Sequence, residues 1–326
     1  MINEAESTKY LGETIGQVNI DKNIEERYNK GIGSVNQIVS LLSEGMFRQN
    51  YFRTAIIFRN SFLINSMMFS SEALYGMKKL NLDKLNSCDT YLWKNLFGTE
   101  KCCPIISYYI ESGCAPPHII LVGRRLMFHW SILQRPDTEL VRQVYNIQKK
   151  LPVKNDWVHQ ISSDLEKCQI YLSDQEIKSL TKISYKKIVL EKINFLTDCW
   201  IEEKMGTKSS QLGERGLKDY LISPEISLRE KRLLYALRTY TTNLKYNRKS
   251  SYTTNLDCSL CYTHIEDQES LLLCPTLLSD VRLSSIIKTI KYSDIFGTLS
   301  EQTRAVRVWS KVIEVFEDIQ LRRQQP

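Results

Sequence analysis

The sequence predicts a mainly α-helical fold, in which a helical bundle is followed by a helical linker region, a small cysteine-containing loop and a C-terminal helical segment. The chain has 326 residues but only 13 glycines and 8 prolines, which favours long helices over a turn-rich β architecture. It is 42% hydrophobic and 25% charged, as is typical of a globular protein. Apolar residues recur at three- and four-residue intervals through most of the chain, as amphipathic helices require.

The first predicted elements are a short strand and two long helices. Residues 10–12, followed by Thr14 and Ile15, predict a strand that turns at a glycine. After Asp21, an acceptable N-cap, the apolar residues between 24 and 42 fall on one face of a helix. Residues 51–69 are apolar almost all round, which indicates a helix at the centre of a bundle.

Four more helices are predicted before residue 151. They cover 82–98, 104–113, 116–133 and 137–150, with prolines at the start and glycines at the end of several of them. The last of the four is interpreted as a polar helix. His129, next to a tryptophan in the third, is expected to be packed in the core rather than catalytic.

The remaining chain is predicted to be helical apart from two polar stretches. A second helical block begins at Asp156, and residues 182–204 form a lysine-rich amphipathic helix. Residues 206–216 are a polar connection. After the cysteine-containing stretch, a final helix carries a single apolar stripe between Val306 and Ile319.

These patterns predict a division of the chain in sequence order. The predicted segments are a strand or hairpin over 1–20, a helical bundle over 21–100, a helical linker region over 101–250, a knuckle over 251–280 and a C-terminal helical segment over 281–326.

The strongest chemical motif lies near the C-terminus, where Cys258 and Cys261 form a C-x2-C pair followed by His264 and Cys274. Two thiolates at this spacing can bind one metal ion from a tight turn, and zinc then needs two more ligands. The sequence therefore predicts zinc as a cofactor, held by Cys258, Cys261, His264 and Cys274. The alternative is that the cysteines are ordinary buried thiols, since free cysteine packs as a small hydrophobe.

Basic residues suggest three surfaces for phosphates. The formal net charge is +7, which is compatible with a nucleic-acid partner. In order of preference, the candidate contacts are a segment leading into the knuckle, a pair within 116–133 and a pair within 182–204: Arg238, Lys245, Arg248 and Lys249; Arg124 and Arg125; Lys186 and Lys187. The competing interpretation of each group is a solvated face with no ligand.

Cysteine usage and hydropathy bear on the compartment. The chain has nine cysteines, an odd number, and the stretch from Met1 to Lys9 lacks an apolar leader. Reduced thiols in the nucleus or cytoplasm are expected, rather than a disulfide framework. The longest apolar runs are too short to cross a bilayer, so no membrane partner is predicted.

Several short motifs, taken in order, resemble the part of a non-LTR (LINE-type) retrotransposon reverse transcriptase that follows its catalytic palm. Tyr10-Leu11-Gly12 is similar to the motif that leaves the palm, and residues 24–42 are similar to the helix that opens the thumb. Residues 74–76 and 89–98 resemble the next two blocks, and residues 111–125 resemble the block that ends in paired arginines.

The C-terminal half continues the resemblance. The stretch 233–239 leads to the C-x2-C pair and then to 269–275, as in the knuckle of that family. The family has a histidine four residues before the last cysteine, where this chain has Ser270. His264 would have to replace that ligand, or a carboxylate of Glu266, Asp267 or Glu269 would complete a weaker site.

The resemblance implies a thumb-like bundle, a zinc-knuckle-like loop, and RNA or DNA bound through its backbone, with an upstream polymerase region as a further partner. The family polymerises DNA on an RNA template with paired palm aspartates that bind divalent metals. This sequence has no adjacent Asp-Asp pair, so we expect a non-catalytic nucleic-acid-binding fragment. The alternatives are a helical protein-interaction module and a truncated relic of a transposon polyprotein without activity.

Overall fold

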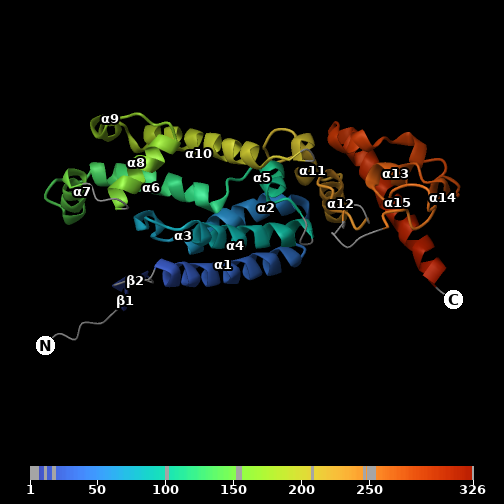
Figure 1. The fold of residues 1–326 in the computed structure, drawn as a ribbon, viewed down its shortest axis with the longest axis horizontal. Coiled ribbons are helices and arrows are strands. Elements are labelled where there is room, and N and C mark those ends of the chain that lie inside the picture. The colour runs from blue at the N-terminus through green and yellow to red at the C-terminus, as the bar shows by residue number, and fades with distance from the viewer. Residues whose placement is uncertain are drawn as a thin grey trace. The chain divides into compact units, whose positions relative to one another are not determined.

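The computed structural model describes residues 7–10, 13–16, 20–99, 103–151, 156–206, 209–244, 247 and 255–324. The described chain is mainly helical, which confirms the predicted fold class (Figure 1). No described helix is both long enough and apolar enough to cross a membrane.

Within the described ranges, the regular elements are two short strands and a series of helices. The strands β1 (Ser7–Tyr10) and β2 (Glu13–Gly16) pair antiparallel, with Ser7 opposite Gly16. The α-helices are α1 (Ile20–Ser43), α2 (Tyr51–Phe58), α3 (Ile64–Met68), α4 (Lys79–Phe97), α5 (Ile105–Ser112), α6 (Pro117–Leu133), α7 (Leu140–Lys150), α8 (Trp157–Lys167), α9 (Asp174–Ser179), α10 (Lys182–Lys204), α11 (Asp219–Ile222), α12 (Leu228–Arg238), α13 (Gln268–Leu272), α14 (Pro275–Leu278) and α15 (Leu299–Gln324). Shorter helical turns are η1 (Arg48–Asn50), η2 (Arg59–Leu63), η3 (Ser71–Ala73), η4 (Ser209–Leu212), η5 (Ile287–Thr289) and η6 (Tyr292–Phe296).

The chain divides into two compact units, each assembled from three separate stretches. Unit 1 comprises 1–43, 55–92 and 114–204, and unit 2 comprises 44–54, 93–113 and 205–326. The five segments predicted above are continuous in the sequence, and that division stays a prediction. The two compact units instead combine stretches that are far apart in the sequence.

The core of unit 1 at its α6–α10 end is built around α6. That helix packs against α10, which runs alongside it in Figure 1, and also contacts α7, α8 and α9. Leu126, Trp157 and Tyr185 are among the buried residues of this cluster. Elsewhere in unit 1, α1 packs on α3, and the predicted apolar face of α1 is buried at Ile24, Val35, Ile38 and Leu42.

Unit 2 has its own core, centred on α12 and α15. The predicted stripe of α15 is confirmed at Val306, Trp309 and Phe316, which are all buried. Phe97 stacks on Tyr235 of α12 with ring centroids 3.9 Å apart. The knuckle region, with α13 and α14, also packs in this unit, where α14 contacts α15.

The helix predicted over 51–69 is interrupted at η2, which is a π-helical turn. Arg59 begins this turn with a side chain that is fully buried. Its guanidinium forms two hydrogen bonds to Asp89, of 2.6 and 2.7 Å, and a third to the carbonyl of Ala115. A π-helical turn changes which way a side chain faces, and here it accompanies a buried ion pair that periodicity alone cannot indicate.

The predicted stop at Gly113 is confirmed, and the structure gives its reason. Gly113 has φ +73°, and a Cβ built there would lie 2.9 Å from the backbone nitrogen of Leu217. Glycine is therefore required by the left-handed conformation and also by the close approach of the backbone at Gly216 and Leu217.

Candidate metal centre and basic surfaces

The first two cysteines of the predicted knuckle are presented by a tight turn. Asp257 and Ile265 form an antiparallel bridge, and the backbone N–H of Cys258 donates to the carbonyl of His264 at 2.6 Å. The N–H of Leu260 points at the sulfur of Cys258, with a nitrogen–sulfur distance of 3.4 Å. The turn therefore brings two sulfurs to one side of the loop, as the C-x2-C spacing predicts.

The end of α15 holds this turn in place. The guanidinium of Arg323 donates to the carbonyls of Ser259 and Leu260, at 3.2 and 2.8 Å. On the other side, the carboxylate of Glu266 accepts hydrogen bonds from the backbone and the hydroxyl of Ser259. Arg323 is distant from the C-x2-C pair in the sequence, and Glu266 lies across its turn. These two contacts give the loop a defined shape.

Three thiols meet beside the turn. The sulfurs of Cys258, Cys261 and Cys274 all lie within 4.8 Å of one another, and those of Cys258 and Cys274 are 3.9 Å apart. Tetrahedral zinc with Zn–S bonds of about 2.3 Å needs sulfurs separated by about 3.8 Å. The three cysteines can therefore hold a metal ion with little rearrangement.

The electrostatics of the pair also suit a thiolate. The hydrogen bond from Cys258 lowers the pKa of Cys274 to about 7, and backbone N–H groups at the start of α14 act in the same direction. The same hydrogen bond, together with burial, raises the pKa of Cys258. These opposite shifts make Cys274 the thiol of the pair that ionises more readily. A lowered thiol pKa suits a metal site, because the metal ligand is the thiolate.

His264, the predicted fourth ligand, lies apart from the three thiols. The side chain of His264 is exposed, and this residue does not belong to the group of ligand atoms formed by the three cysteines. His264 lies on the returning arm of the turn, where its carbonyl is engaged by Cys258. Of the predicted set Cys258, Cys261, His264 and Cys274, the structure brings the three thiols together, and His264 as the fourth ligand stays a prediction.

The acidic alternatives have other contacts. The carboxylate of Glu266 binds Ser259, and Asp267 caps α13 by accepting from the backbone N–H of Ser270 at 2.8 Å. The side chain of Glu269 is exposed. The donor set of three sulfurs fits zinc or another thiophilic ion with one position left for a ligand from outside the group.

Arg238, the first predicted phosphate contact, is buried instead. It pairs with the buried carboxylate of Glu111 at 2.9 Å and donates to the carbonyls of Ile295 and Leu212. Only 3% of the residue is exposed. Every contact is within unit 2, so Arg238 joins several of its elements and cannot reach a phosphate without breaking a buried ion pair.

The paired arginines of α6 are also committed to unit 1. Arg125 binds Asp164 of α8 through two hydrogen bonds, of 2.5 and 3.0 Å, and both residues are buried. Arg124 is half-buried, and its guanidinium donates to the carbonyl of Met68 and to the side chain of Asn65. Arg125 is therefore held in a buried ion pair and Arg124 in hydrogen bonds within unit 1, and contact of this pair with nucleic acid stays a prediction.

Lys186 and Lys187 lie as predicted on the exposed side of α10. Lys245, Arg248 and Lys249 lie outside the described residues, so their prediction stays open. A further basic group was not among the predicted phosphate contacts. Arg304, Arg307 and Lys311 occupy the outer side of α15, opposite its buried stripe. The spacing of these three cations by three and four residues could have indicated it.

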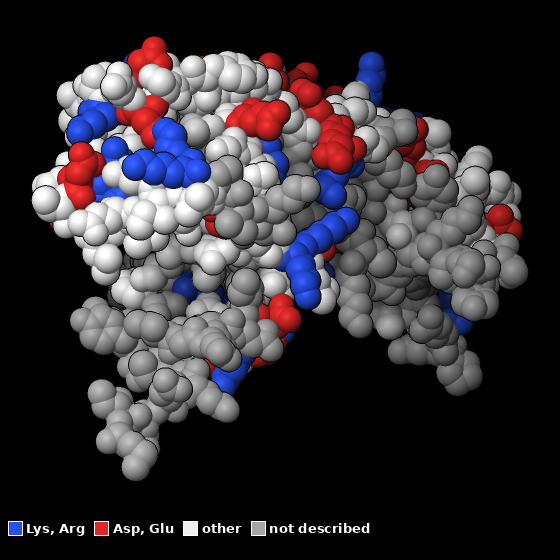
Figure 2. Space-filling view, turned by 60° about the vertical axis from the view of Figure 1, so that its left-hand side comes forward, with Lys and Arg blue, Asp and Glu red and all other residues white. Residues whose placement is uncertain are grey.

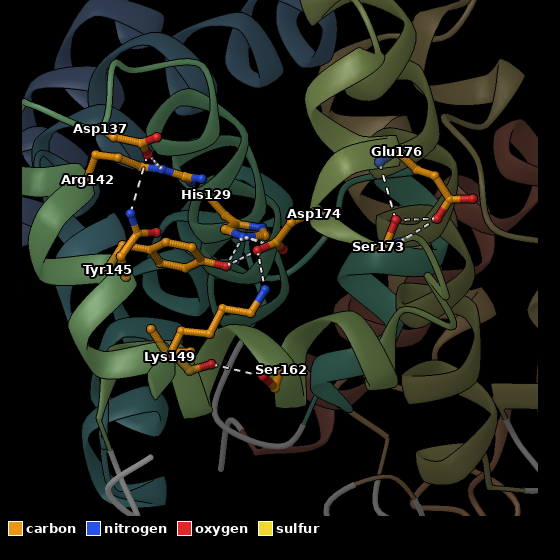
Figure 3. A network of polar contacts seen from close by, with 11 residues as sticks. His129, Asp137, Arg142, Tyr145, Lys149, Ser162, Ser173, Asp174 and Glu176 are labelled. Carbon is orange, nitrogen blue, oxygen red and sulfur yellow. Dashed lines mark hydrogen bonds and ion pairs between the residues drawn. The ribbon is translucent and has the colours of Figure 1, made fainter. Parts of the chain in front are cut away.

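A polar network in unit 1 has no signal in the sequence patterns described above (Figure 3). The hydroxyl of Tyr145 donates to Asp174 at 2.7 Å, and Lys149 pairs with the same carboxylate at 2.5 Å. The Nε2 of His129 lies 3.1 Å from the Tyr145 hydroxyl and 3.5 Å from Asp174. His129 is therefore packed, as expected, but it is packed into a network that links α6, α7 and the start of α9.

No protein-family model, curated protein or solved structure matches this chain.

Proposed function

We propose that this chain is a non-catalytic nucleic-acid-binding module with a zinc knuckle. The observation that carries the proposal is the group of three thiols formed by Cys258, Cys261 and Cys274. The Cys258 and Cys274 sulfurs, 3.9 Å apart, stand at nearly the separation that tetrahedral zinc needs between two thiolate ligands. Zinc fits the donor set, and its role is to fix the loop.

Basic residues come shortly before the knuckle in the sequence. Lys245, Arg248 and Lys249 come within thirteen positions of Cys258 in the sequence. Between Asp219 and Asp257 the only acidic residues of the sequence are Glu225 and Glu230. In this proposal, these cations bind phosphates. Arg238 is excluded from this surface because of its ion pair with Glu111.

Backbone contacts, rather than base readout, suit the distribution of charge. The exposed cations Lys186 and Lys187 on α10, and the segment before the knuckle, carry long flexible side chains that neutralise phosphates without distinguishing sequence. The net charge of +7 adds attraction at long range.

The resemblance to the post-palm region of a retrotransposon reverse transcriptase supports the same function. In this proposal, the polymerase chemistry of that family is absent from the chain, which has no adjacent aspartate pair.

Two measurements test the proposal together. Metal analysis of the purified chain should find about one zinc per chain, as a structural site requires. Binding of a fluorescently labelled duplex should be weakened by Cys258→Ser, which removes a ligand, and not by Cys199→Ser, which changes an exposed cysteine far from the knuckle in sequence. The proposal would be contradicted if the purified chain contained no zinc and the Cys258→Ser and Cys199→Ser variants bound the duplex equally well.

A further inference from the structure

A small pocket lies in unit 1 beside the polar network of Figure 3. It is lined by residues of α6, α7 and α9 and by α8 with its N-cap, and its volume is about 240 Å³. A molecule of liquid water takes about 30 Å³, so the pocket has room for a small organic molecule. All of the lining residues fall within 114–204, so the pocket belongs to unit 1 alone.

The side chains that line the pocket carry a net negative charge. Asp156 and Asp174 contribute −2 and Lys149 contributes +1, which leaves −1 with the histidines neutral. Lys149 binds Asp174 at 2.5 Å, and Asp174 also accepts from the hydroxyl of Tyr145 (Figure 3). The uncompensated charge of the lining is therefore that of Asp156. Figure 2 looks toward the end of unit 1 that carries α7 and α9, where acidic and basic side chains are mixed, so no large basic patch there would repel a cation.

Asp156 has one oxygen without a hydrogen-bond partner in the described part of the chain. Its Oδ1 caps α8 by accepting from the backbone N–H of His159 at 2.7 Å, whereas its Oδ2 is buried and unpartnered. Only 8% of Asp156 is exposed. A buried carboxylate oxygen without a donor is unfavourable, because the hydrogen bonds that it made to water are not replaced.

His129 presents a second acceptor of this kind. The hydroxyl of Tyr145 donates its proton to Asp174, so it can only accept from Nε2 of His129, 3.1 Å away. This contact places the ring proton on Nε2 and leaves Nδ1 as an acceptor, since a second proton would create a buried charge with an unpaired N–H. Nδ1 is buried and has no partner among the described residues, and only 1% of His129 is exposed.

These features define the chemistry of a ligand. Surplus acceptors need hydrogen-bond donors, and a net charge of −1 favours a single positive charge. An ammonium group supplies both to Asp156 through a charge-assisted hydrogen bond, and a second donor in the same molecule satisfies Nδ1 of His129. Val158, Ile161 and Leu165 offer apolar surface to the carbon atoms between the two donors.

A single metal ion does not fit this pocket. Among the described residues, the only group of three or more metal-ligating side chains with ligand atoms within 4.8 Å of one another is that of the three cysteines of the knuckle. The carboxylates and imidazoles of the pocket are therefore too widely spaced to surround one ion.

We propose that this pocket binds a small primary-ammonium compound that carries a second hydrogen-bond donor, such as an amino alcohol. The ammonium group binds Asp156, and the second donor binds Nδ1 of His129. This interaction goes beyond nucleic-acid binding, and it uses neither the knuckle nor the predicted phosphate contacts.

Three small molecules of similar length provide the probes: 4-amino-1-butanol, 1,4-butanediol and 1-butylamine. The diol lacks the charge, and the amine lacks the second donor. Binding of each to the full chain at pH 7, without nucleic acid, is measured by isothermal titration calorimetry. The amino alcohol should bind at least about tenfold more tightly than the diol and about threefold or more tightly than the amine, because a charge-assisted hydrogen bond contributes more than a neutral one.

Asp156→Asn is the test variant, and Asp137→Asn is its matched control. Asparagine caps a helix about as well as aspartate, so the test variant keeps α8 while it loses the charge and presents a donor where the ligand needs an acceptor. Binding of 4-amino-1-butanol should weaken by about tenfold or more. The side chain of Asp137 is 79% exposed and does not line the pocket, so the control should bind as the native chain does.

A second readout does not depend on the heat of binding. At a saturating concentration, 4-amino-1-butanol should raise the Tm of the native chain and of Asp137→Asn, because it binds the folded state. The Tm of Asp156→Asn should not rise. This comparison also shows whether each variant is folded before its binding is interpreted.

Four results would overturn the proposal. Equal binding of 4-amino-1-butanol and 1,4-butanediol would show that charge is not recognised. Equal loss of binding in Asp156→Asn and Asp137→Asn would indicate a general attraction to acidic surface. Binding of inorganic phosphate in place of the ammonium compound would identify an anion site. Absence of binding of all three probes would reject a ligand of this class.

Discussion

Buried arginine–carboxylate pairs are the residue-level feature that most limits which cations can bind phosphates. Arg59 with Asp89, Arg125 with Asp164, and Arg238 with Glu111 are all buried pairs. Removing one member of such a pair leaves the other charge buried without compensation, which costs several kcal/mol. An arginine in one of these pairs is therefore a structural residue, however favourable its position in the sequence is for nucleic acid.

Arg238→Met should destabilise unit 2 by about 3–5 kcal/mol, because it leaves the carboxylate of Glu111 buried and unpaired. Arg229→Met, in the first turn of the same helix, changes an exposed arginine and should cost about 0.5 kcal/mol or less. Denaturant unfolding of the two variants measures the difference. Equal stability of the two variants would show that Arg238 is not held as described.

The stability of unit 1 should depend on pH through Asp174. Burial alone would raise the pKa of this carboxyl, but hydrogen bonds from His129, Lys149 and Tyr145 hold it well below its ordinary value. A carboxyl with a depressed pKa in the folded state contributes stability above its unfolded pKa, near 3.9, and loses it as the pH falls toward the folded value.

Asp174→Asn provides the comparison. The free energy of unfolding of the native chain should exceed that of the variant at pH 7, and the gap should shrink as the pH falls below about 4. Denaturant unfolding at a series of pH values measures the gap. A gap that stays constant down to the lowest pH at which the chain folds would contradict the role of the ionised carboxylate.

At the scale of elements, periodicity and capping residues predict most helices, and pairing between distant segments is what they miss. Gly113 and the stripe of α15 were predictable because each depends on local geometry or on a single face. The C-x2-C half of the knuckle was predictable for the same reason. Its fourth ligand was not, because whether His264 faces the sulfurs depends on how the turn is bridged at Asp257 and Ile265.

Helix α7 shows a related limit. The composition of residues 137–150 predicts a polar helix, since charged and amide residues outnumber the apolar ones there. The structure shows that the polar residues Arg142 and Lys149 face neighbouring acids, while the apolar residues Leu140, Val144 and Ile147 face solvent. Composition identifies the helix but does not indicate which of its two faces is turned inward.

The knuckle gives an element-level prediction. Cys261→Ser should lose most of the bound zinc, whereas His264→Ala should keep it, because the three sulfurs and not the imidazole form the group of ligands. Metal analysis of both variants after dialysis measures the content. Hydrogen exchange should show that the loss loosens residues 255–278 and spares α1 and α6, which belong to a separate core. Zinc that depends on His264 and not on Cys261 would refute this arrangement.

At the scale of the whole molecule, the separate cores of the two units set what a local change can do. Each unit buries its own apolar residues, so disruption of the knuckle should not unfold unit 1. The sequence could predict the mainly helical class but not this division, because unit 2 is assembled from three stretches separated by those of unit 1.

The purified chain should not extend a primer on an RNA template in the presence of magnesium or manganese. Nucleotidyl transfer of this kind needs paired carboxylates that hold two metal ions, and the sequence has no adjacent aspartate pair. A primer-extension assay with a known reverse transcriptase as positive control makes the measurement. Extension that co-purifies with the chain through successive columns would contradict a non-catalytic role.

The salt dependence of duplex binding tests the central claim most directly. If about three cations before the knuckle contact phosphates, the logarithm of the binding constant should fall with the logarithm of the salt concentration with a slope of about −3. Replacing Lys245, Arg248 and Lys249 together by alanine should remove most of that slope, while replacing Arg229 should change it little. Absence of binding at low salt, or a slope that the triple substitution leaves unchanged, would contradict the account.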